Sequence, residues 1–191
     1  MVGRLLSFSG RDRASALSAA GGIEEATFEA LFRSAAGDVH AYAISLLGDR
    51  SAAEDVTSLA FERLYRSRSR LDRRRGTPRA LLFAIARNAA LDELRRRSRQ
   101  PQSELGVQEA DDHDSEAALE DVERWATVRD ALAALPLRER EVVLLKFHGE
   151  LSHGELARAL GISESNAATR LHRALTRLRQ ECHSMGGQEV A

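Results

Sequence analysis

The sequence has little of what builds disulfides, sheets or membrane anchors. Its 191 residues include one cysteine, three prolines and 5% aromatic residues. The single cysteine excludes an intramolecular disulfide and favours a reducing compartment. No apolar run approaches the roughly 18 residues that a membrane-spanning helix needs, and the start of the chain lacks the continuous apolar core of a signal peptide. We therefore expect a cytoplasmic protein without membrane insertion.

The composition favours an all-α fold. Hydrophobic residues make up 43% of the chain, alanine and leucine are abundant, and few residues break helices. Apolar residues recur with helical spacing in two segments, 24–99 and 121–182. Between them, 100–120 contains the acidic run EADDHDSE and no apolar periodicity. We predict two small helical domains joined by a flexible acidic linker, with loose tails at 1–23 and 183–191.

Helix-boundary signals mark the first segment. Gly48 predicts a helix C-terminus, and Ser51 with Glu54 predicts a capping box at the start of the next helix. Thr77 followed by Pro78 predicts a third start, with threonine as the N-cap and proline at the first helical position. The first helix is expected to bury an apolar stripe made of Phe28, Leu31, Phe32, Ala35, Val39, Tyr42, Ala43, Leu46 and Leu47.

A second pattern, in residues 151–179, is typical of a helix-turn-helix. Ser152 and Glu155 form a predicted capping box, Gly161 can adopt the left-handed conformation of a sharp turn, and Ser163 can cap the next helix. A short helix, a glycine-containing turn and a longer second helix are the arrangement of a DNA-binding motif. The alternative interpretation is a solvated basic helix in an ordinary bundle.

The second helix of this motif carries residues suited to both bases and phosphates. Leucines 171, 175 and 178 are expected to face inward, which leaves Ala168, Thr169, His172, Arg173 and Thr176 on other faces. Arginine can contact guanine through two hydrogen bonds, and threonine can touch a thymine methyl group. Contacts to phosphates set affinity rather than sequence preference, and the side chains better placed for them are Arg170, Arg177 and Arg179.

Arginines also cluster at both ends of the helix predicted after Pro78. Arg73–Arg75 precede it, and Arg95–Arg97 with Arg99 lie at its C-terminus. Two basic clusters along one element can follow a phosphate backbone. A solvated helix end whose cations suit the helix dipole is the alternative.

Taken together, the motifs resemble those of a bacterial sigma factor of the extracytoplasmic-function (ECF) group. The resemblance covers about residues 28–179 and rests on AEDVTSLAFERLYR, then RALLFAIARNAALDELRRR, then a linker, then LPLREREVVLLKFHGELSHGELARALGISESNAATRLHRALTRLR. It implies two helical domains, no enzyme activity and no cofactor or metal. It also implies three partners: core RNA polymerase, promoter DNA and an inhibitory anti-sigma factor.

The resemblance implies roles by position. The first domain would bind the polymerase β′ clamp, and the second would contact the β flap. Residues matching the clamp-binding part are Asp55, Ser58, Phe61, Glu62 and Leu64. Residues matching the part that reads the −10 element and holds an extruded base are Arg73, Arg74, Arg75, Asn88, Asp92, Arg95 and Arg96. Residues matching the −35 reader are Ala168, Thr169, His172 and Arg173, with Arg170 and Arg177 on the DNA backbone.

Departures from the family pattern fall within these same regions. Ser58-Leu59 stand where the family often has Gln-Glu, Leu81 replaces a usual tryptophan, and Ala84 replaces a usual arginine. Ala167-Ala168-Thr169 replace a Val-Lys/Arg-Ser pattern. We therefore expect different clamp contacts and an unusual −35 preference.

Other functions remain open at this point. A response-regulator-type activator has a similar helix-turn-helix, but it lacks the arginine-rich first segment and binds DNA without polymerase. An enzyme would need a site, and Asp111–Asp114 offer metal-type ligands only within the predicted linker. Cys182 with His172 and His183 lacks the spacing of a zinc site.

Overall fold

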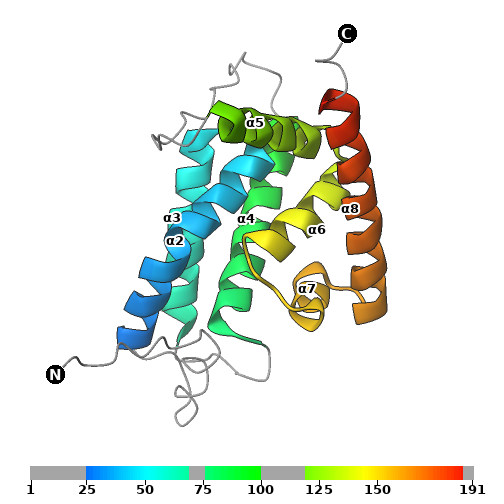
Figure 1. Cartoon of the computed structure of the whole chain (residues 1–191). Coiled ribbons are helices and arrows are strands. Elements are labelled where there is room, and N and C mark those ends of the chain that lie inside the picture. The colour runs from blue at the N-terminus through cyan, green and yellow to red at the C-terminus, as the bar shows by residue number, and fades with distance from the viewer. Residues whose placement is uncertain (1–24, 69–75, 100–118, 187–191) are drawn as a thin grey trace, which may run out of the picture.

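The computed structural model describes residues 25–68, 76–99 and 119–186, and within these ranges the regular structure is entirely helical. This confirms the all-α prediction. The helices, shown in Figure 1, are α2 (Glu25–Leu47), α3 (Arg50–Ser67), α4 (Pro78–Arg99), α5 (Leu119–Ala134), α6 (Leu137–Phe147), α7 (His153–Leu160) and α8 (Glu164–Gly186).

Helices α2, α3 and α4 form what we call the first unit. Its core contains the fully buried side chains of Tyr42, Leu64, Leu82 and Phe83. The rings of Tyr42 and Phe83 meet edge to face with their centroids 5.8 Å apart, a preferred arrangement of aromatic pairs. The unit therefore presents one side of each helix to a shared core and leaves the opposite sides to solvent or to other helices.

Local signals located most helix boundaries of the first unit. Helix α2 ends at Leu47, and Gly48 adopts a left-handed φ of 65°. At the start of α4, the Thr77 hydroxyl accepts a hydrogen bond of 3.2 Å from the backbone N–H of Ala80. Both predictions are confirmed.

The predicted capping box of α3 is wrong. The helix begins at Arg50, and its N-cap is Asp49, whose carboxylate accepts a hydrogen bond of 3.0 Å from the backbone N–H of Ala52. Asp49 is fixed by Arg97 of α4, whose Nη2 lies 2.8 Å from the same carboxyl group. Ser51 is thus the second residue of the helix, and Glu54 pairs with Arg50 instead. A tertiary ion pair selects between two residues, Asp49 and Ser51, that can both cap a helix.

Substituting Asp49 tests this double role. Asp49→Ala removes both the N-cap and the partner of Arg97, so we expect the free energy of unfolding to fall by about 1–2 kcal/mol. Urea unfolding followed by circular dichroism measures it. Glu54→Gln is the control, because its exposed pair with Arg50 is worth less than about 1 kcal/mol. Equal losses in the two variants would contradict the assignment of Asp49 as the cap.

Helices α5–α8 form the second unit. Helix α6 lies at its centre and buries Val142, Val143, Leu144 and Leu145. The predicted inward residues of α8 do contact this core: Leu171 is 6% exposed, and Leu175 and Leu178 are partly buried against it. Helix α8 also continues to Gly186, so residues 183–186 of the predicted loose tail are helical.

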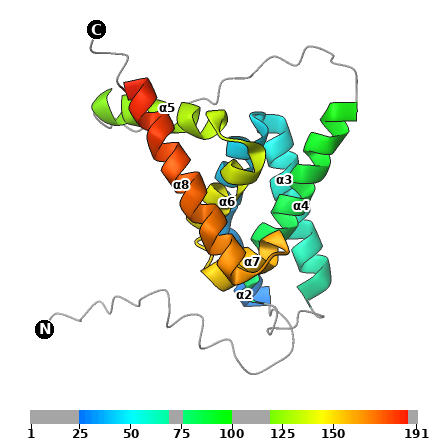
Figure 2. The ribbon, with the colours of Figure 1, turned by 90° about the vertical axis from the view of Figure 1, so that its right-hand side faces the viewer.

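The two units pack against each other. Figure 2 shows α7 between the starts of α4 and α8, and α6 lies alongside α2. The buried apolar residues of both units belong to one continuous core. This closed arrangement was not expected from the sequence, which predicted two domains on a tether. In the described ranges, no helix is both long enough and apolar enough to span a membrane.

Candidate nucleic-acid interface

The helix-turn-helix is built from local capping interactions. The Ser152 hydroxyl accepts from the backbone N–H of Glu155 at 3.3 Å, and the Glu155 carboxylate accepts from the backbone N–H of Ser152 at 3.0 Å. Gly161 closes α7 with a left-handed φ of 67°. The Ser163 hydroxyl then accepts from the backbone N–H of Asn166 at 3.3 Å. All four predicted turn and cap residues are confirmed in these conformations.

Helix α8 has a buried side and a basic exposed side. Ala167, Leu171 and Ala174 are buried. The opposite side exposes Thr169, His172, Arg173, Thr176 and Arg177, while Ala168 and Arg170 are partly buried. Of the four positions predicted to read the −35 element, Thr169, His172 and Arg173 are exposed and accessible to a DNA groove, whereas Ala168 is partly buried.

Two of the polar groups on this helix already have partners. The Thr169 hydroxyl donates to the carbonyl of Ser165 at 2.9 Å, which leaves its oxygen as an acceptor and its methyl group exposed. Arg177 Nη1 lies 3.1 Å from Glu139 of α6. A phosphate must therefore compete with Glu139 for Arg177, whereas the described residues offer Arg173 no ion-pair partner.

The C-terminal end of α4 carries the second basic cluster. Asp92, Arg95, Arg96 and Arg99 line a surface hollow. Arg95 lies 2.9 Å from Asp92. Arg96 and Arg97 both pair with Glu93, with N–O distances of 2.7 and 2.8 Å. The acidic side chains hold the arginines in place and reduce the net positive charge that the cluster presents.

Glu93 pairs with two arginines of this cluster, and the pH dependence of stability tests whether these ion pairs stabilise the fold. Hydrogen bonds from Arg96 and then Arg97 hold the pKa of Glu93 at about 2, against an ordinary value of 4.5, in spite of partial burial. Because the pKa is lower in the folded state, the stabilisation is present above about pH 4.5 and is lost as pH falls toward 2. We expect Glu93→Gln to lower the free energy of unfolding by about 1–2 kcal/mol at pH 7.

Urea unfolding across pH checks this prediction, since the wild type and Glu93→Gln should converge as pH approaches 2. The control is Glu29→Gln, which removes an exposed pair with Arg33 and should change stability by less than about 1 kcal/mol. A gap between wild type and Glu93→Gln that stays constant with pH would contradict the role of the carboxylate charge.

The other residues predicted to read the −10 element are only partly placed. Arg73, Arg74 and Arg75 lie outside the described residues. Asn88 is exposed on α4, where its side-chain oxygen accepts a hydrogen bond of 3.3 Å from Arg87. Asn88 therefore lies on the same helix as the hollow lined by Asp92 and Arg95.

The predicted polymerase-binding residues divide into surface and core. Asp55, Ser58 and Glu62 are exposed on α3. Phe61 is 4% exposed and Leu64 is fully buried, so these two side chains stabilise the first unit. Some apolar residues of this helix were expected to be core, because α3 needs an apolar side to pack against α2 and α4; a role of Phe61 and Leu64 in polymerase binding stays a prediction.

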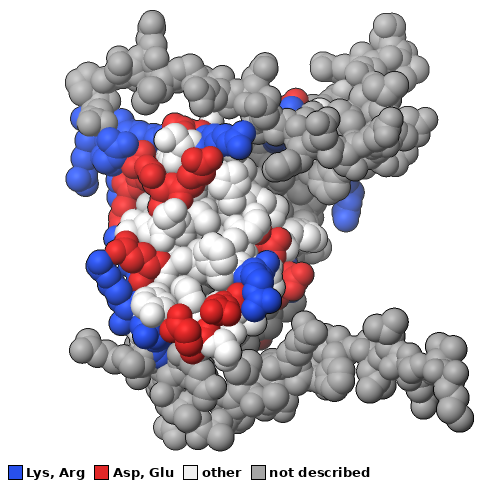
Figure 3. Space-filling view, turned by 90° about the vertical axis from the view of Figure 1, so that its left-hand side faces the viewer, with Lys and Arg blue, Asp and Glu red and all other residues white. Residues whose placement is uncertain are grey.

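Sequence analysis missed an exposed aromatic residue on α2. Phe32 was expected in the core, but it is 49% exposed, and its ring contacts that of Phe61 at 4.8 Å between centroids. Figure 3 shows one side of the molecule, where an uncharged area lies between acidic and basic groups. The helical spacing that placed Phe32 beside Phe28 and Leu31 could have indicated a stripe wider than the core requires.

Other kinds of site have little support in the part of the chain that the structure describes. No group of three histidine, cysteine, aspartate or glutamate side chains there is arranged to hold a metal ion. Cys182 is a free, partly buried thiol on α8. The acidic run Asp111–Asp114 lies outside the described ranges.

Comparison with known families matches both units. The family model described as sigma-70 region 2 matches residues 31–100, and that described as sigma-70 region 4 matches residues 126–178. The first match covers the exposed side of α3 and the basic end of α4. The second covers the helix-turn-helix and the basic side of α8.

Similar proteins match this chain over most of its length. The ECF RNA polymerase sigma factor SigL of Mycobacterium tuberculosis is 30% identical over 89% of this chain and 97% of its own length. The ECF RNA polymerase sigma factor RpoE of Cereibacter sphaeroides is 30% identical over 82% of this chain and 87% of its own. In fold, the chain is similar to the sigma factor RpoE from Bartonella quintana, solved with the anti-sigma factor NepR. That likeness has a TM-score of 0.66 at 23% identity and covers 81% of this chain and 95% of the other.

Proposed function

Because this chain belongs to the extracytoplasmic-function group of the sigma-70 family, a family of transcription regulators rather than enzymes, we propose how its surfaces divide the work of promoter recognition. The first unit binds the polymerase clamp and the −10 element, and the second unit reads the −35 element. The observation that carries this assignment is the exposed His172–Arg173 side of α8 on a fully capped helix-turn-helix.

The −35 element is read in the major groove by α8. Thr169, His172 and Arg173 are exposed on one side of the helix and can reach base edges. Ala168 contributes a small apolar surface, which suits a thymine methyl group. Arg170 and Arg177 bind phosphates and set the position of the helix, and for Arg177 this requires release from Glu139.

The −10 element is bound by the basic end of α4 with the loop that precedes it. Asn88, Asp92, Arg95 and Arg96 supply hydrogen-bond donors and acceptors on one helix. Arg73–Arg75 belong to the same proposed surface by family resemblance. Extruding a base costs a few kcal/mol, and the arginines repay part of this cost through phosphate contacts.

Core polymerase binds the exposed side of α3. Asp55, Ser58 and Glu62 are accessible there, and Phe32 of the neighbouring helix adds an apolar contact. An inhibitory anti-sigma factor covers the same surface, a proposal supported by the structural relative solved with such a partner. The protein acts in the cytoplasm, without enzyme activity or cofactor.

Run-off transcription tests the function as a whole. Core RNA polymerase from the source organism is given a genomic promoter library, with and without this protein. New transcripts whose templates share two spaced upstream elements are the expected result. If no transcripts form and the protein does not co-purify with core polymerase, the function would be that of a stand-alone activator of response-regulator type.

A further inference from the structure

The contact between the two units is the feature that the proposed function does not use. Promoter elements centred at −35 and −10 lie about 25 base pairs apart, or roughly 85 Å along B-DNA. A compact chain of this length has a radius of gyration of about 16 Å and spans roughly 40 Å. The closed arrangement therefore cannot place both proposed DNA-binding surfaces on their elements at once.

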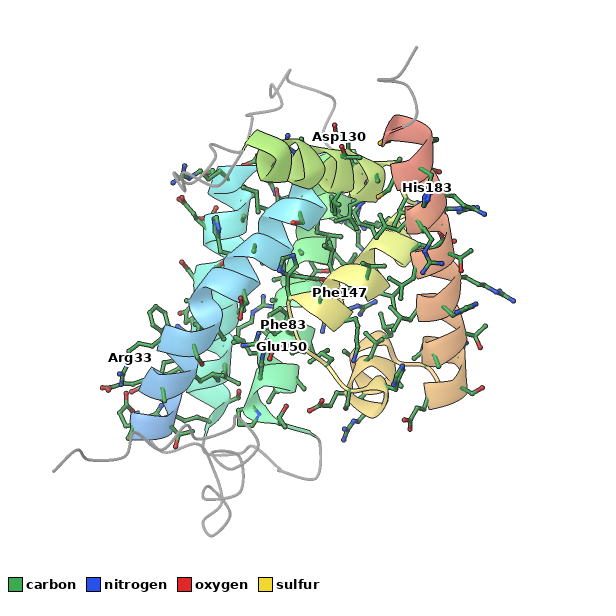
Figure 4. The ribbon with its side chains drawn as sticks, viewed as in Figure 1. Arg33, Phe83, Asp130, Phe147, Glu150 and His183 are labelled. Atoms are coloured by element: carbon green, nitrogen blue, oxygen red, sulfur yellow. The ribbon has the colours of Figure 1, made fainter. Side chains whose placement is uncertain are left out.

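Arg79 of α4 makes three hydrogen bonds, two of which connect the first unit to the second. It donates to the carbonyls of His148 and Gly149 at 2.6 and 3.0 Å, at the turn between α6 and α7, and to the Asp38 carboxylate of α2 at 2.6 Å. Its guanidinium also lies 5.3 Å from the ring centroid of Phe83. Figure 4 labels Phe83 of α4, Phe147 at the end of α6 and Glu150 in the turn that follows.

A second polar contact joins the helix starts. The Thr77 hydroxyl donates to the Glu155 carboxylate at 2.6 Å. Thr77 caps α4 and Glu155 belongs to the capping box of α7. The contact therefore ties the first turn of α4 directly to the helix-turn-helix.

The third contact is a buried ion pair. Arg87 Nε of α4 lies 2.5 Å from Glu141 Oε1 of α6, with the two side chains 18% and 5% exposed. Neither of these atoms has the alignment that a hydrogen bond requires, and the buried hydroxyl of Tyr42 also lacks a partner in the described structure. Burial, and then the negative charge of Glu141, raise the pKa of Tyr42.

These contacts describe an interface that can open. Buried polar groups that are incompletely satisfied regain hydrogen bonds to water when they are exposed. Arg87 belongs to the first unit and Glu141 to the second, so separating the units would part the two charges and expose them to solvent. Their attraction stabilises the closed form, and their burial limits how stable it can become.

We propose that the Arg87–Glu141 pair is an autoinhibitory latch that holds the free chain closed, and that core polymerase binds the opened form. The role of this pair in holding the chain closed does not depend on what the protein does. The inference that closure competes with polymerase binding rests on the proposed function. Only the open form binds polymerase. The apparent affinity of the chain for polymerase is therefore the affinity of the open form multiplied by the fraction of chains that are open.

Energy transfer within the full-length chain tests the latch. One dye is placed on the single native cysteine, Cys182 of α8, and the other on Arg63→Cys, an exposed position on α3. In this background we compare the unchanged pair, Arg87→Met, Glu141→Leu and the double variant Arg87→Met/Glu141→Leu. Arg33→Ala, which removes an exposed pair on α2, is the surface control.

The latch predicts a specific pattern among these proteins. Each single variant leaves one charge buried without its partner, so the ratio of closed to open chains should fall by roughly 100-fold or more, and energy transfer should fall with it. The double variant replaces the pair with apolar side chains and should restore high transfer. Unchanged far-UV circular dichroism separates opening from unfolding.

Three outcomes would overturn the latch: low transfer in the protein with the pair intact, high transfer in both single variants, or low transfer in the double variant. Association with core polymerase is then measured for the same variants of the latch in chains that keep Arg63 and carry no dye, because Arg63 lies beside Glu62 on the proposed polymerase-binding side of α3. The single variants should associate about 10-fold faster, and the double variant at the original rate or more slowly. If all variants associate with polymerase at equal rates and the chain supports run-off transcription, closure does not compete with polymerase binding. Failure of every protein to bind polymerase would instead reject the proposed function, and the energy transfer would still decide the latch.

Discussion

Replacing Arg173 with alanine is expected to reduce transcription from a cognate promoter by about 5- to 150-fold, because a bidentate contact between arginine and guanine is worth about 1–3 kcal/mol. Arg173 lies on the exposed side of α8, and its neighbours Leu171 and Ala174 are buried on the opposite side. The buried side fixes the helix, so the substitution removes a contact to DNA without disturbing the fold. Thermal unfolding should be unchanged.

A promoter library with every base of the −35 element varied gives the measurement. Arg173→Ala should lose discrimination at one base pair and retain it elsewhere. Arg177→Ala is the matched control on the same helix. Its side chain pairs with Glu139 and is assigned to a phosphate, so its loss should weaken transcription similarly for all sequences. If Arg173→Ala also weakened all sequences equally, Arg173 would be a phosphate contact.

Sequence analysis located the parts of the site that depend on local chemistry. The caps at Thr77 and Ser152 and the turn at Gly161 each satisfy backbone groups within a few residues, so their patterns carry the information needed to place them. The positions exposed on α8 followed from the helical period once its buried leucines were identified. The local patterns and the observed geometry therefore agree over the whole helix-turn-helix.

Interactions between distant residues could not be predicted in this way. Asp49 rather than Ser51 caps α3 because Arg97, 48 residues away, reaches its carboxylate. The same holds for the closed arrangement, since Arg79 and His148 are 69 residues apart and Thr77 and Glu155 are 78 apart. No periodicity in the sequence encodes such pairings.

Family resemblance and apolar patterns do not determine which side chains are exposed. Phe61 and Leu64 match family positions that bind polymerase, and the first unit buries both in its core. Phe32 matched the core stripe, yet about half of it is exposed. A stripe identifies which side of a helix is apolar, whereas the width of the neighbouring helices decides how much of it is covered.

Gly149 is the position at which a single added methyl group is expected to destabilise the fold most. The residue is buried at the turn between α6 and α7. A Cβ atom there would lie 2.4 Å from the carbonyl oxygen of Leu145 and 3.0 Å from Cγ of Leu151. The first neighbour is backbone and cannot rotate away, so the turn must shift. We expect Gly149→Ala to lower the free energy of unfolding by about 2–3 kcal/mol and the melting temperature by roughly 5–10 °C.

The same substitution at Gly37 provides a control with the opposite sign. Gly37 lies within α2, and a Cβ atom built on it meets nothing within 4 Å. Alanine is favoured over glycine inside a helix by about 0.5–1 kcal/mol, so Gly37→Ala should raise the melting temperature by a few degrees. Calorimetry on both variants measures the two changes in melting temperature. A small effect of Gly149→Ala would mean that the turn can relax. The Gly149 carbonyl, which accepts a hydrogen bond from Arg79 across the two units, would then not be held in a fixed position.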